Sequence, residues 1–274
     1  MTVNELKNKA IDVREAVLDM VYHAKSGHIG GDLSCADIMT ALFFSVLDID
    51  PKEPEATSRD RFILSKGHSA ETYYACLAMR GFFPESELAT YCAFGSRLLG
   101  HPTNKVPGID MNTGALGHGL SIATGLAIGL RKRKIPKKVY VLMGDGEQAE
   151  GSNWEALMAA ANYNLDNLVA ILDRNHLQIS GNTEDVMKLE PLSEKYSAFG
   201  WKTVEIDGNS MEEILKALST SHEGKPLMII ANTIKGKGIK EMENIASWHH
   251  GIPDQRLYLK AKEELKEARR AAND

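Results

Sequence analysis

The stretch that decides the fold runs from Val139 to Leu177 and begins Val139-Tyr140-Val141-Leu142-Met143-Gly144-Asp145-Gly146. Five apolar residues lead directly into the Gly-Asp-Gly turn, and a second apolar run, Leu168 to Leu172, ends at Asp173-Arg174-Asn175. Continuous apolar runs of this length are typical of strands that are buried on both faces. The stretch therefore predicts two buried strands, one followed by an acid and the other by an amide.

The segment between these strands is long enough for a crossover helix, which we expect around Trp154 to Asn162. Parallel strands need such a crossover, so Asp145 and Asn175 are expected at the carboxyl ends of adjacent parallel strands. Ligands of open α/β sheets bind at that edge, where backbone N–H groups and helix N-termini favour anions. The sequence predicts an α/β fold, a mainly parallel sheet with helices on both faces, and a diphosphate site at its carboxyl edge.

The residues at this edge also suit a magnesium ion. Gly144 and Gly146 allow a sharp turn and a close backbone approach, Asp145 offers a carboxylate oxygen, and Asn175 offers a neutral amide oxygen. Magnesium is usually held by few side-chain oxygens together with substrate phosphates. A lone Gly-Asp-Gly would be an ordinary turn, and the second strand ending in Asn175 is what favours a metal site.

Gly-Asp-Gly, a helix, and then a strand ending in Asn together resemble the cofactor motif of thiamine diphosphate enzymes. The resemblance implies that Gly144, Asp145, Gly146 and Asn175 bind the cofactor. It also implies that the side chains of Asp145 and Asn175 and the backbone carbonyl of Leu177 hold Mg²⁺, or another divalent cation such as Ca²⁺ or Mn²⁺.

Length and composition fit a single domain over residues 1–274. The net charge of −5 does not indicate the excess of positive charge that is typical of proteins that bind nucleic acid. Three cysteines without ligand spacing indicate reduced thiols. The polar N-terminus does not resemble a signal peptide, and we expect no apolar stretch long enough to cross a bilayer. We therefore expect a soluble, cytoplasmic protein with no nucleic-acid or membrane partner.

The N-terminal part predicts a helix from Glu5 to Ala24, a glycine-rich loop, and a second helix capped by Ser34. A histidine in such a loop, His28, has an ordinary interpretation as a surface turn residue. However, Ser26-Gly27-His28-Ile29-Gly30, with Arg14 before it, resembles the N-terminal signature of transketolases. That resemblance implies that His28 lies in a substrate channel and hydrogen-bonds sugar hydroxyls.

Two further loops resemble transketolases. The pattern RDRFILSKGH predicts a strand at Arg61–Ser65 and places His68 at its carboxyl end, which the resemblance puts against the diphosphate and the substrate. Gly100-His101-Pro102 is similar to a loop whose histidine contacts the substrate. The glycines of the following segment permit close approach to a flat cofactor, and the implied contacts are Gly114, Ala115 and Leu116. His118 stands where the family often has Gln.

The second half predicts strands from Trp201 to Ile206 and from Pro226 to Thr233. The latter ends near Lys235, which by default would be solvated but which the resemblance places near the diphosphate. Ser247-Trp248-His249-His250-Gly251 is similar to another histidine loop; the spacing from Lys235 favours His249, and His250 remains open. Glu150 is expected at a helix N-terminus, where an acid stabilises the helix dipole, and the resemblance implies that it lies near the cofactor and the dimer interface.

The resemblance extends from about Arg14 to about Gly251, but it covers only the first of three transketolase domains. It implies a split transketolase, in which a C-terminal subunit supplies the aminopyrimidine-binding domain and its activating glutamate. His28, His68, His101 and His249 would act on sugar-phosphate substrates, and we expect a heterotetramer with two copies of each chain. Two rivals are another thiamine diphosphate enzyme subunit, of ketoacid dehydrogenase alpha or deoxyxylulose-phosphate synthase type, and a non-catalytic cofactor-binding protein.

Overall fold

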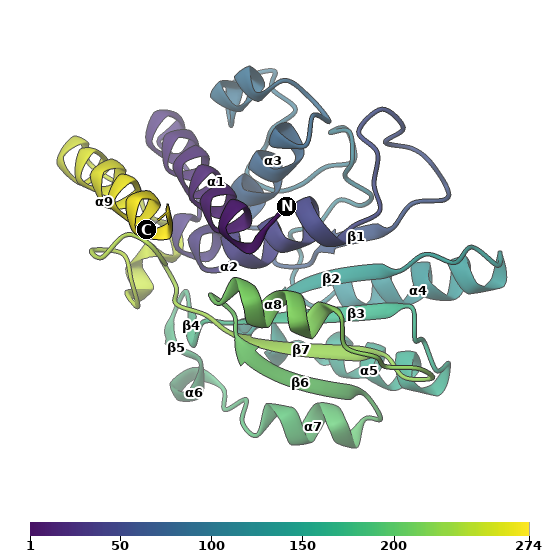
Figure 1. Ribbon diagram of the computed structural model, residues 1–274. Coiled ribbons are helices and arrows are strands. Elements are labelled where there is room, and N and C mark those ends of the chain that lie inside the picture. Colours follow the sequence, from purple (N-terminus) through teal and green to yellow (C-terminus); the bar gives the residue numbers. More distant parts are fainter. Residues whose placement is uncertain (274) are drawn as a thin grey trace.

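The computed structural model, which describes residues 1–273, is built on one parallel sheet (Figure 1). The strand order is β1-β2-β3-β7-β6, and every neighbouring pair is parallel. The bounds are β1 (Arg61–Leu64), β2 (Val139–Gly144), β3 (Leu168–Arg174), β6 (Lys202–Asp207) and β7 (Leu227–Asn232). The predicted α/β fold with a parallel sheet is confirmed, and β2 and β3 are adjacent as expected.

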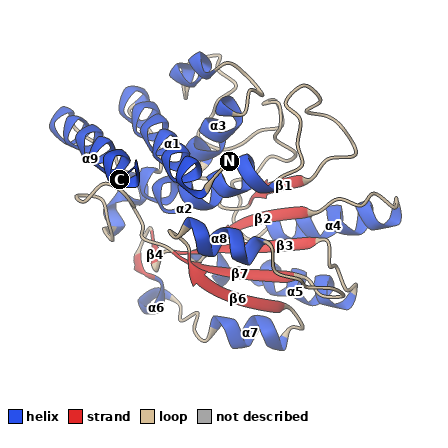
Figure 2. Ribbon diagram, viewed as in Figure 1, coloured by secondary structure: helices blue, strands red, loops and turns tan. Residues whose placement is uncertain are grey.

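Helices cover both faces of the sheet, because the strands alternate between two apolar cores (Figure 2). Tyr140 and Leu142 of β2 belong to one core, whereas Val139, Val141 and Met143 belong to the other. The first core is covered by α1 (Val3–Ala24), α2 (Ile29–Ala41), α3 (Ala70–Met79), α8 (Met211–Leu218) and α9 (Gln255–Asn273). The second is covered by α4 (Gly119–Lys132), α5 (Gly151–Asn162) and α7 (Leu192–Ala198). This alternation explains why the central strands β2, β3 and β7 are almost continuously apolar and buried. The edge strand β6 is instead polar and partly exposed.

Seven shorter elements complete the described part of the chain. They are η1 (Leu42–Val46), η2 (Glu85–Thr90), η3 (Gly146–Ala149), β4 (Leu177–Gln178), β5 (Gly181–Asn182), α6 (Thr183–Val186) and η4 (Ala246–His250). The strands β4 and β5 form a small antiparallel ribbon directly after β3. The C-terminal helix α9 lies alongside α1 (Figure 1), and Tyr258 donates a hydrogen bond to Asp19 of α1 at 2.8 Å.

The expectation that Ser34 caps the second helix is wrong. Helix α2 already begins at Ile29, so Gly30 and Gly31 form its first turn and Ser34 lies inside it. A Cβ at Gly30 would approach the backbone oxygen of Trp248 to 2.6 Å, so the glycine permits close packing there and does not form a loop. The Ser34 hydroxyl instead lies 2.7 Å from Oδ2 of Asp173, at the end of β3.

One stretch, Ile29–Val46, is long and apolar enough to cross a membrane by length and composition alone, contrary to the expectation from sequence. Most of it is buried inside the protein, where it packs as α2 and η1. A core helix passes such a test as readily as a membrane span does.

Candidate active site

The predicted site residues follow the carboxyl ends of four neighbouring strands. Strand β1 leads to His68, β2 to Asp145, β3 to Asn175 and β7 to Lys235. Because all four strands are parallel, their ends meet at one edge of the sheet. The loops that carry His28, His101 and His249 reach the same edge from outside the sheet.

Asp145 is tied to the turn that follows β3. Its Oδ2 accepts a hydrogen bond from the backbone N–H of His176 at 2.6 Å and lies 3.2 Å from the guanidinium of Arg174. Within the turn, Leu177 N–H donates to Oδ1 of Asn175 at 3.1 Å. The structure therefore brings the three predicted metal ligands, Asp145, Asn175 and Leu177, to one place.

Burial raises the pKa of Asp145, and the nearby Asp173 carboxylate adds to this effect. Arg174 and backbone N–H groups only partly offset it. A buried carboxylate whose charge is incompletely compensated is a fitting ligand for a cation. Within residues 1–273, no cluster of three or more His, Cys, Asp or Glu side chains could hold a metal ion. The predicted set of one carboxylate, one amide and one carbonyl is a different kind of site, which depends on phosphate and water for its other ligands.

Lys235 is buried beside this turn. Its ammonium group donates to the backbone oxygen of Leu177 at 3.0 Å and lies 3.2 Å from Nδ1 of His249. Burial, with the charge of Lys66 nearby, lowers the pKa of Lys235 to about 8. Both hydrogen-bond partners are neutral, and in the described part of the chain no carboxylate forms an ion pair with it. A buried cation in this setting fits an anionic group such as a diphosphate.

Five histidine rings gather next to Lys235. The ring centroid of His28 lies 5.5 Å from that of His68, 5.8 Å from those of His101 and His249, and 4.9 Å from that of His250. The rings of His68 and His249 are 5.0 Å apart. Both candidates at the ambiguous position thus reach the cluster: His249 contacts Lys235 and His68, and His250 contacts His28.

Four of these histidines, His28, His68, His101 and His249, are held in the neutral form. Burial, together with the neighbouring His250, His101 and Lys235, lowers the pKa of His28 to about 4. Burial and Lys235 lower the pKa of His249 to about 3, and burial also lowers the pKa values of His68 and His101. Neutral imidazoles can both donate and accept hydrogen bonds at pH 7, which suits contact with hydroxyl and carbonyl groups.

The loop of Gly114, Ala115 and Leu116 lies against His101 and the end of β1. A Cβ at Gly114, where φ is +144°, would approach the ring of His101 to 2.9 Å. A Cβ at Gly67 would meet the backbone nitrogen of Gly114 at 2.7 Å. These close approaches require glycine and fix the loop beside the histidines.

The other residues predicted to bind the cofactor are Gly144, Gly146 and Glu150. Gly144 ends β2 and Gly146 opens η3, where a Cβ would meet Gln178 at 2.9 Å. Glu150 is exposed and is the N-cap of α5, as expected for an acid at a helix N-terminus. It packs against Gly117, whereas none of its described contacts reaches Lys235 or the histidines.

Two sets of buried charged side chains at this edge were not predicted from the sequence. Lys66 forms a fully buried ion pair with Asp173, whose carboxylate also accepts a hydrogen bond from Asn175 at 3.1 Å. Glu147 accepts hydrogen bonds from Ser65, from Gly117 N–H at 2.8 Å and from Gly144 N–H at 3.0 Å. The sequence signal for these groups was a charged residue inside an apolar strand or within three residues of its end.

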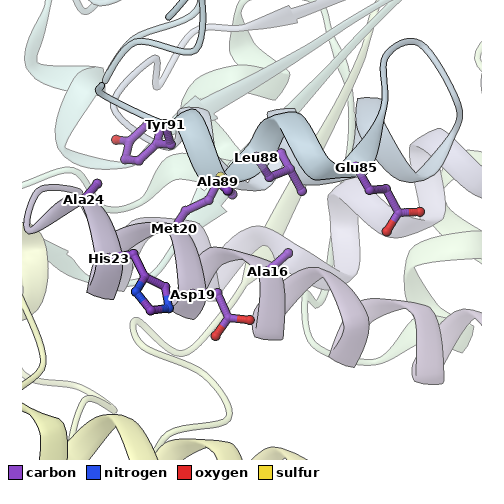
Figure 3. Close-up of a pocket in the computed structure, with 9 residues that line it drawn as sticks. All are labelled: Ala16, Asp19, Met20, His23, Ala24, Glu85, Leu88, Ala89 and Tyr91. Atoms are coloured by element: carbon purple, nitrogen blue, oxygen red, sulfur yellow. The ribbon is translucent and has the colours of Figure 1, made fainter. Parts of the chain in front are cut away.

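A separate cavity of about 580 Å³ lies between α1 and η2 (Figure 3). Asp19, His23 and Glu85 line it together with mostly apolar side chains, and Tyr91 stands at one end. None of its lining residues is a predicted site residue. The candidate site is therefore the open sheet edge and not this cavity.

Comparison with known proteins decides the family. The family described as "Transketolase, thiamine diphosphate binding domain" matches residues 6–270. The chain belongs to this family. The resemblance predicted from the sequence is thereby confirmed, and the fold agrees with that of solved transketolases.

Several relatives are themselves named as transketolase subunits. The chain is 49% identical to an apulose-4-phosphate transketolase subunit of Phocaeicola vulgatus, over 97% of this chain and 96% of that protein. It is 40% identical to the 6-deoxy-6-sulfo-D-fructose transketolase subunit SqwG of a Clostridium species, over 95% and 96% of the two chains. These relatives match the present chain over nearly their whole length.

Longer transketolases match over their first part. Human transketolase is 42% identical over 89% of this chain but only 39% of its own length. The crystal structure of Campylobacter jejuni transketolase superposes with a TM-score of 0.92 at 31% identity, covering 99% of this chain and 46% of that one. The chain thus spans less than half of these longer transketolases.

Proposed function

We propose that this chain is the diphosphate-binding subunit of a split transketolase, which transfers a two-carbon ketol unit from a ketose phosphate to an aldose phosphate. The observation that carries the proposal is the near full-length match to an apulose-4-phosphate transketolase subunit. The cluster of neutral histidines beside a buried lysine at the sheet edge supports it.

The residues present fit thiamine diphosphate and magnesium. Asp145, Asn175 and the Leu177 carbonyl would hold the metal, and Lys235 would neutralise diphosphate charge. Asp145 is a buried acid with incompletely compensated charge, and Lys235 is a buried cation with neutral partners. When bound, thiamine diphosphate supplies a nucleophilic carbanion that can carry the two-carbon unit.

The histidines of this chain orient the sugar and move its protons. His28, His68, His101 and His249 are neutral near pH 7. Each can accept a proton or a hydrogen bond from a hydroxyl group and can donate a hydrogen bond to a carbonyl oxygen, and a ring that has taken up a proton can return it to that oxygen. The contact between Lys235 and Nδ1 of His249 orients that ring, so that its Nε2 is the nitrogen left for the substrate.

A partner subunit completes the site in this proposal. The missing part corresponds to the remainder of the longer transketolases, and relatives of this length that are named as transketolase subunits imply a second chain. We propose a heterotetramer with two copies of each chain, since closed two-fold symmetry is the commonest arrangement. The partner would supply the aminopyrimidine-binding domain and most contacts to the sugar phosphate.

Reconstitution tests the proposed function. The chain is mixed with its candidate partner, magnesium and thiamine diphosphate, and ketol transfer is measured with apulose 4-phosphate, xylulose 5-phosphate and 6-deoxy-6-sulfofructose as donors. We expect transfer with at least one donor, no transfer by either chain alone, and a heterotetramer by light scattering. Carboligation of pyruvate without ketol transfer would favour the deoxyxylulose-phosphate synthase type, and binding without any turnover would favour a non-catalytic protein.

Replacing Lys235 with Met should weaken cofactor binding while stabilising the cofactor-free chain. The substitution removes a buried charge whose folded pKa is depressed, so stability below about pH 8 should rise. It also removes the cation proposed to face the diphosphate, which we expect to cost about 10-fold to 100-fold in affinity. Calorimetric titration and thermal unfolding of the two proteins measure these effects.

The pH dependence gives a second check on Lys235. In the wild type, cofactor affinity should fall as pH rises above about 8, because the free lysine loses its proton there. The Lys235→Met variant should lack this fall. Lys237→Met, on the next turn of the same loop but partly exposed, is the matched control and should leave affinity unchanged. Equal affinities for all three proteins would remove Lys235 from the site.

A further inference from the structure

Two buried carboxyl groups lie next to the histidine cluster and have no role in the site described above. Asp32 is in the first turn of α2 and Glu71 is in the first turn of α3, and both are completely buried. The two carboxyl groups lie near each other, and the charge of Glu71 contributes to a raised pKa of Asp32. Buried acids are rare unless they are paired with a cation, and neither of these forms a salt bridge in the described part of the chain.

Each carboxyl group caps the helix that carries the other. Oδ1 of Asp32 accepts a hydrogen bond from the backbone N–H of Thr72, in the first turn of α3, at 2.7 Å. Oε1 of Glu71 accepts one from the backbone N–H of His28, directly before α2, at 3.1 Å. Neither helix is capped by the side chain of its own N-cap residue. The acid pair therefore takes the place of both N-caps.

This reciprocal capping connects two histidines of the site. His28 is the N-cap residue of α2, and His68 directly precedes Ser69, the N-cap residue of α3. A Cβ at Gly27, where φ is +150°, would collide with Oε1 of Glu71, so the chain entering His28 is packed directly on this carboxyl group. Any movement of one helix start relative to the other would change the 5.5 Å spacing of the two rings.

The remaining oxygens imply a proton between the two acids. Oε1 of Glu71 also accepts a hydrogen bond from the hydroxyl of Tyr91 at 2.8 Å, at one end of the cavity in Figure 3. Oδ2 of Asp32 and Oε2 of Glu71 are both buried, and neither has a hydrogen-bond partner within residues 1–273. Burial, with the charge of Glu71 beside it, raises the pKa of Asp32 well above its ordinary value, and burial also raises the pKa of Glu71.

We propose that Asp32 and Glu71 share one proton and act as a single positioning unit that sets the separation of His28 and His68. Two ionised carboxylates in this buried place would repel each other and separate the two helix starts. A pair with one proton satisfies both caps and its own internal hydrogen bond. The importance of the histidine spacing rests on the proposed function, whereas the shared proton is a property of this chain by itself.

Other titratable groups near the pair keep their charge state across the neutral range. They are Cys35 and Lys66 on the side of Asp32, and His28, Tyr74, Tyr91 and Cys92 on the side of Glu71. Burial raises the pKa values of the thiols and phenols, and burial together with neighbouring charges lowers that of His28 to about 4. Burial opposes the charge of Lys66, but Asp173 outweighs it and raises the pKa of that lysine.

Amide substitutions test the shared proton. In Asp32→Asn or Glu71→Gln, the amide oxygen can keep the backbone cap while the amide NH₂ donates to the opposite carboxylate. In the double variant both inner groups are NH₂ donors, and neither finds an acceptor. Each single variant should therefore melt within about 2 °C of the wild type at pH 6, while the double variant should melt about 5 to 10 °C lower.

The shared proton also predicts the direction in which the melting temperature changes with pH. Because the folded pKa of Asp32 is raised, wild-type stability is fully present below the ordinary carboxyl pKa of about 4 and declines as pH rises toward the folded value. The single variants lack this proton, so their melting temperatures should rise relative to the wild type between pH 6 and pH 8.5. Infrared spectra of the wild type at pH 7 should show a buried protonated carboxylic acid that each single variant lacks.

These measurements distinguish a failure of the shared-proton proposal from a failure of the proposed function. In the reconstituted complex, the single variants should keep kcat/KM within about 3-fold, and the double variant should lose at least about 10-fold in kcat with unchanged cofactor affinity. Glu53→Gln with Glu55→Gln, two exposed acids, is the control and should be additive in melting temperature. The shared proton would be rejected if the melting-temperature changes of Asp32→Asn and Glu71→Gln simply add in the double variant, or if the infrared band of a protonated acid is absent. Both results can be obtained even if ketol transfer is never observed.

Discussion

Replacing Asp145 with Asn is expected to abolish magnesium-dependent binding of thiamine diphosphate while leaving the fold intact. Asp145 is 2% exposed and its carboxylate faces the 175–177 turn, so an amide of the same shape fits the same space and loses the charge. Loss of one outer-shell partner already costs up to about 100-fold in metal affinity, and loss of a direct ligand should cost more. Calorimetric titration of the cofactor with and without magnesium measures the effect.

Thermal unfolding separates loss of the ligand from loss of the fold. The variant removes a buried charge that costs stability near pH 7, because burial raises the folded pKa of Asp145. Its NH₂ group, however, faces an N–H donor on either side, from Gly146 or from His176 and Arg174. The two effects oppose each other, so the cofactor-free variant should melt within about 5 °C of the wild type. With cofactor at about 100 times its dissociation constant, the wild type should gain about 2.7 kcal/mol, and the variant should gain nothing.

A matched control for Asp145 is Asp185→Asn, which neutralises an exposed carboxylate on α6. It should behave as the wild type in both measurements. If Asp145→Asn also retained wild-type cofactor affinity, the metal site would be placed wrongly, and Asn175 and Leu177 would lose their proposed roles with it.

Local sequence patterns were sufficient for the strands and for the edge where the site lies. The two apolar runs around Asp145 and Asn175 predicted adjacent parallel strands, because burial on both faces leaves a continuous apolar signal. Lysine and histidine positions at strand ends followed from the same reasoning. The meeting of His28 and His101 with that edge could not be derived from spacing, and it was expected only from the resemblance to transketolases.

Interactions between segments that are distant in the chain could not be predicted from the sequence. Lys66 and Asp173 are 107 positions apart, and Asp32 and Thr72 are 40 apart, so no local periodicity records that they meet. Ser34 shows the opposite error: its residue type favours an N-cap, but the packing of Gly30 against Trp248 starts the helix earlier. Tertiary packing decided each of these cases over local preference.

Replacing His28 with Gln should lower the kcat/KM of the reconstituted enzyme by about 100-fold to 10,000-fold, the range that a positioned acid or base contributes. His28 contacts the rings of His68, His101, His249 and His250, so it lies at the centre of the cluster. It makes no described contact with Asp145, Asn175 or Leu177. Cofactor affinity should therefore stay within about 3-fold of the wild type, because the loss is in the handling of substrate.

The same variant should change the pH dependence of stability. Since the folded pKa of His28 is lowered to about 4 from an unfolded value of about 6.5, the wild type loses stability as pH falls through this window. His28→Gln should reduce that loss. The control is His23→Gln, which replaces an exposed histidine of α1 and should leave kcat/KM unchanged. A His28→Gln enzyme with wild-type kcat/KM for every active donor would show that the centre of the histidine cluster does not touch the substrate, and the catalytic assignment would move to the rings around it.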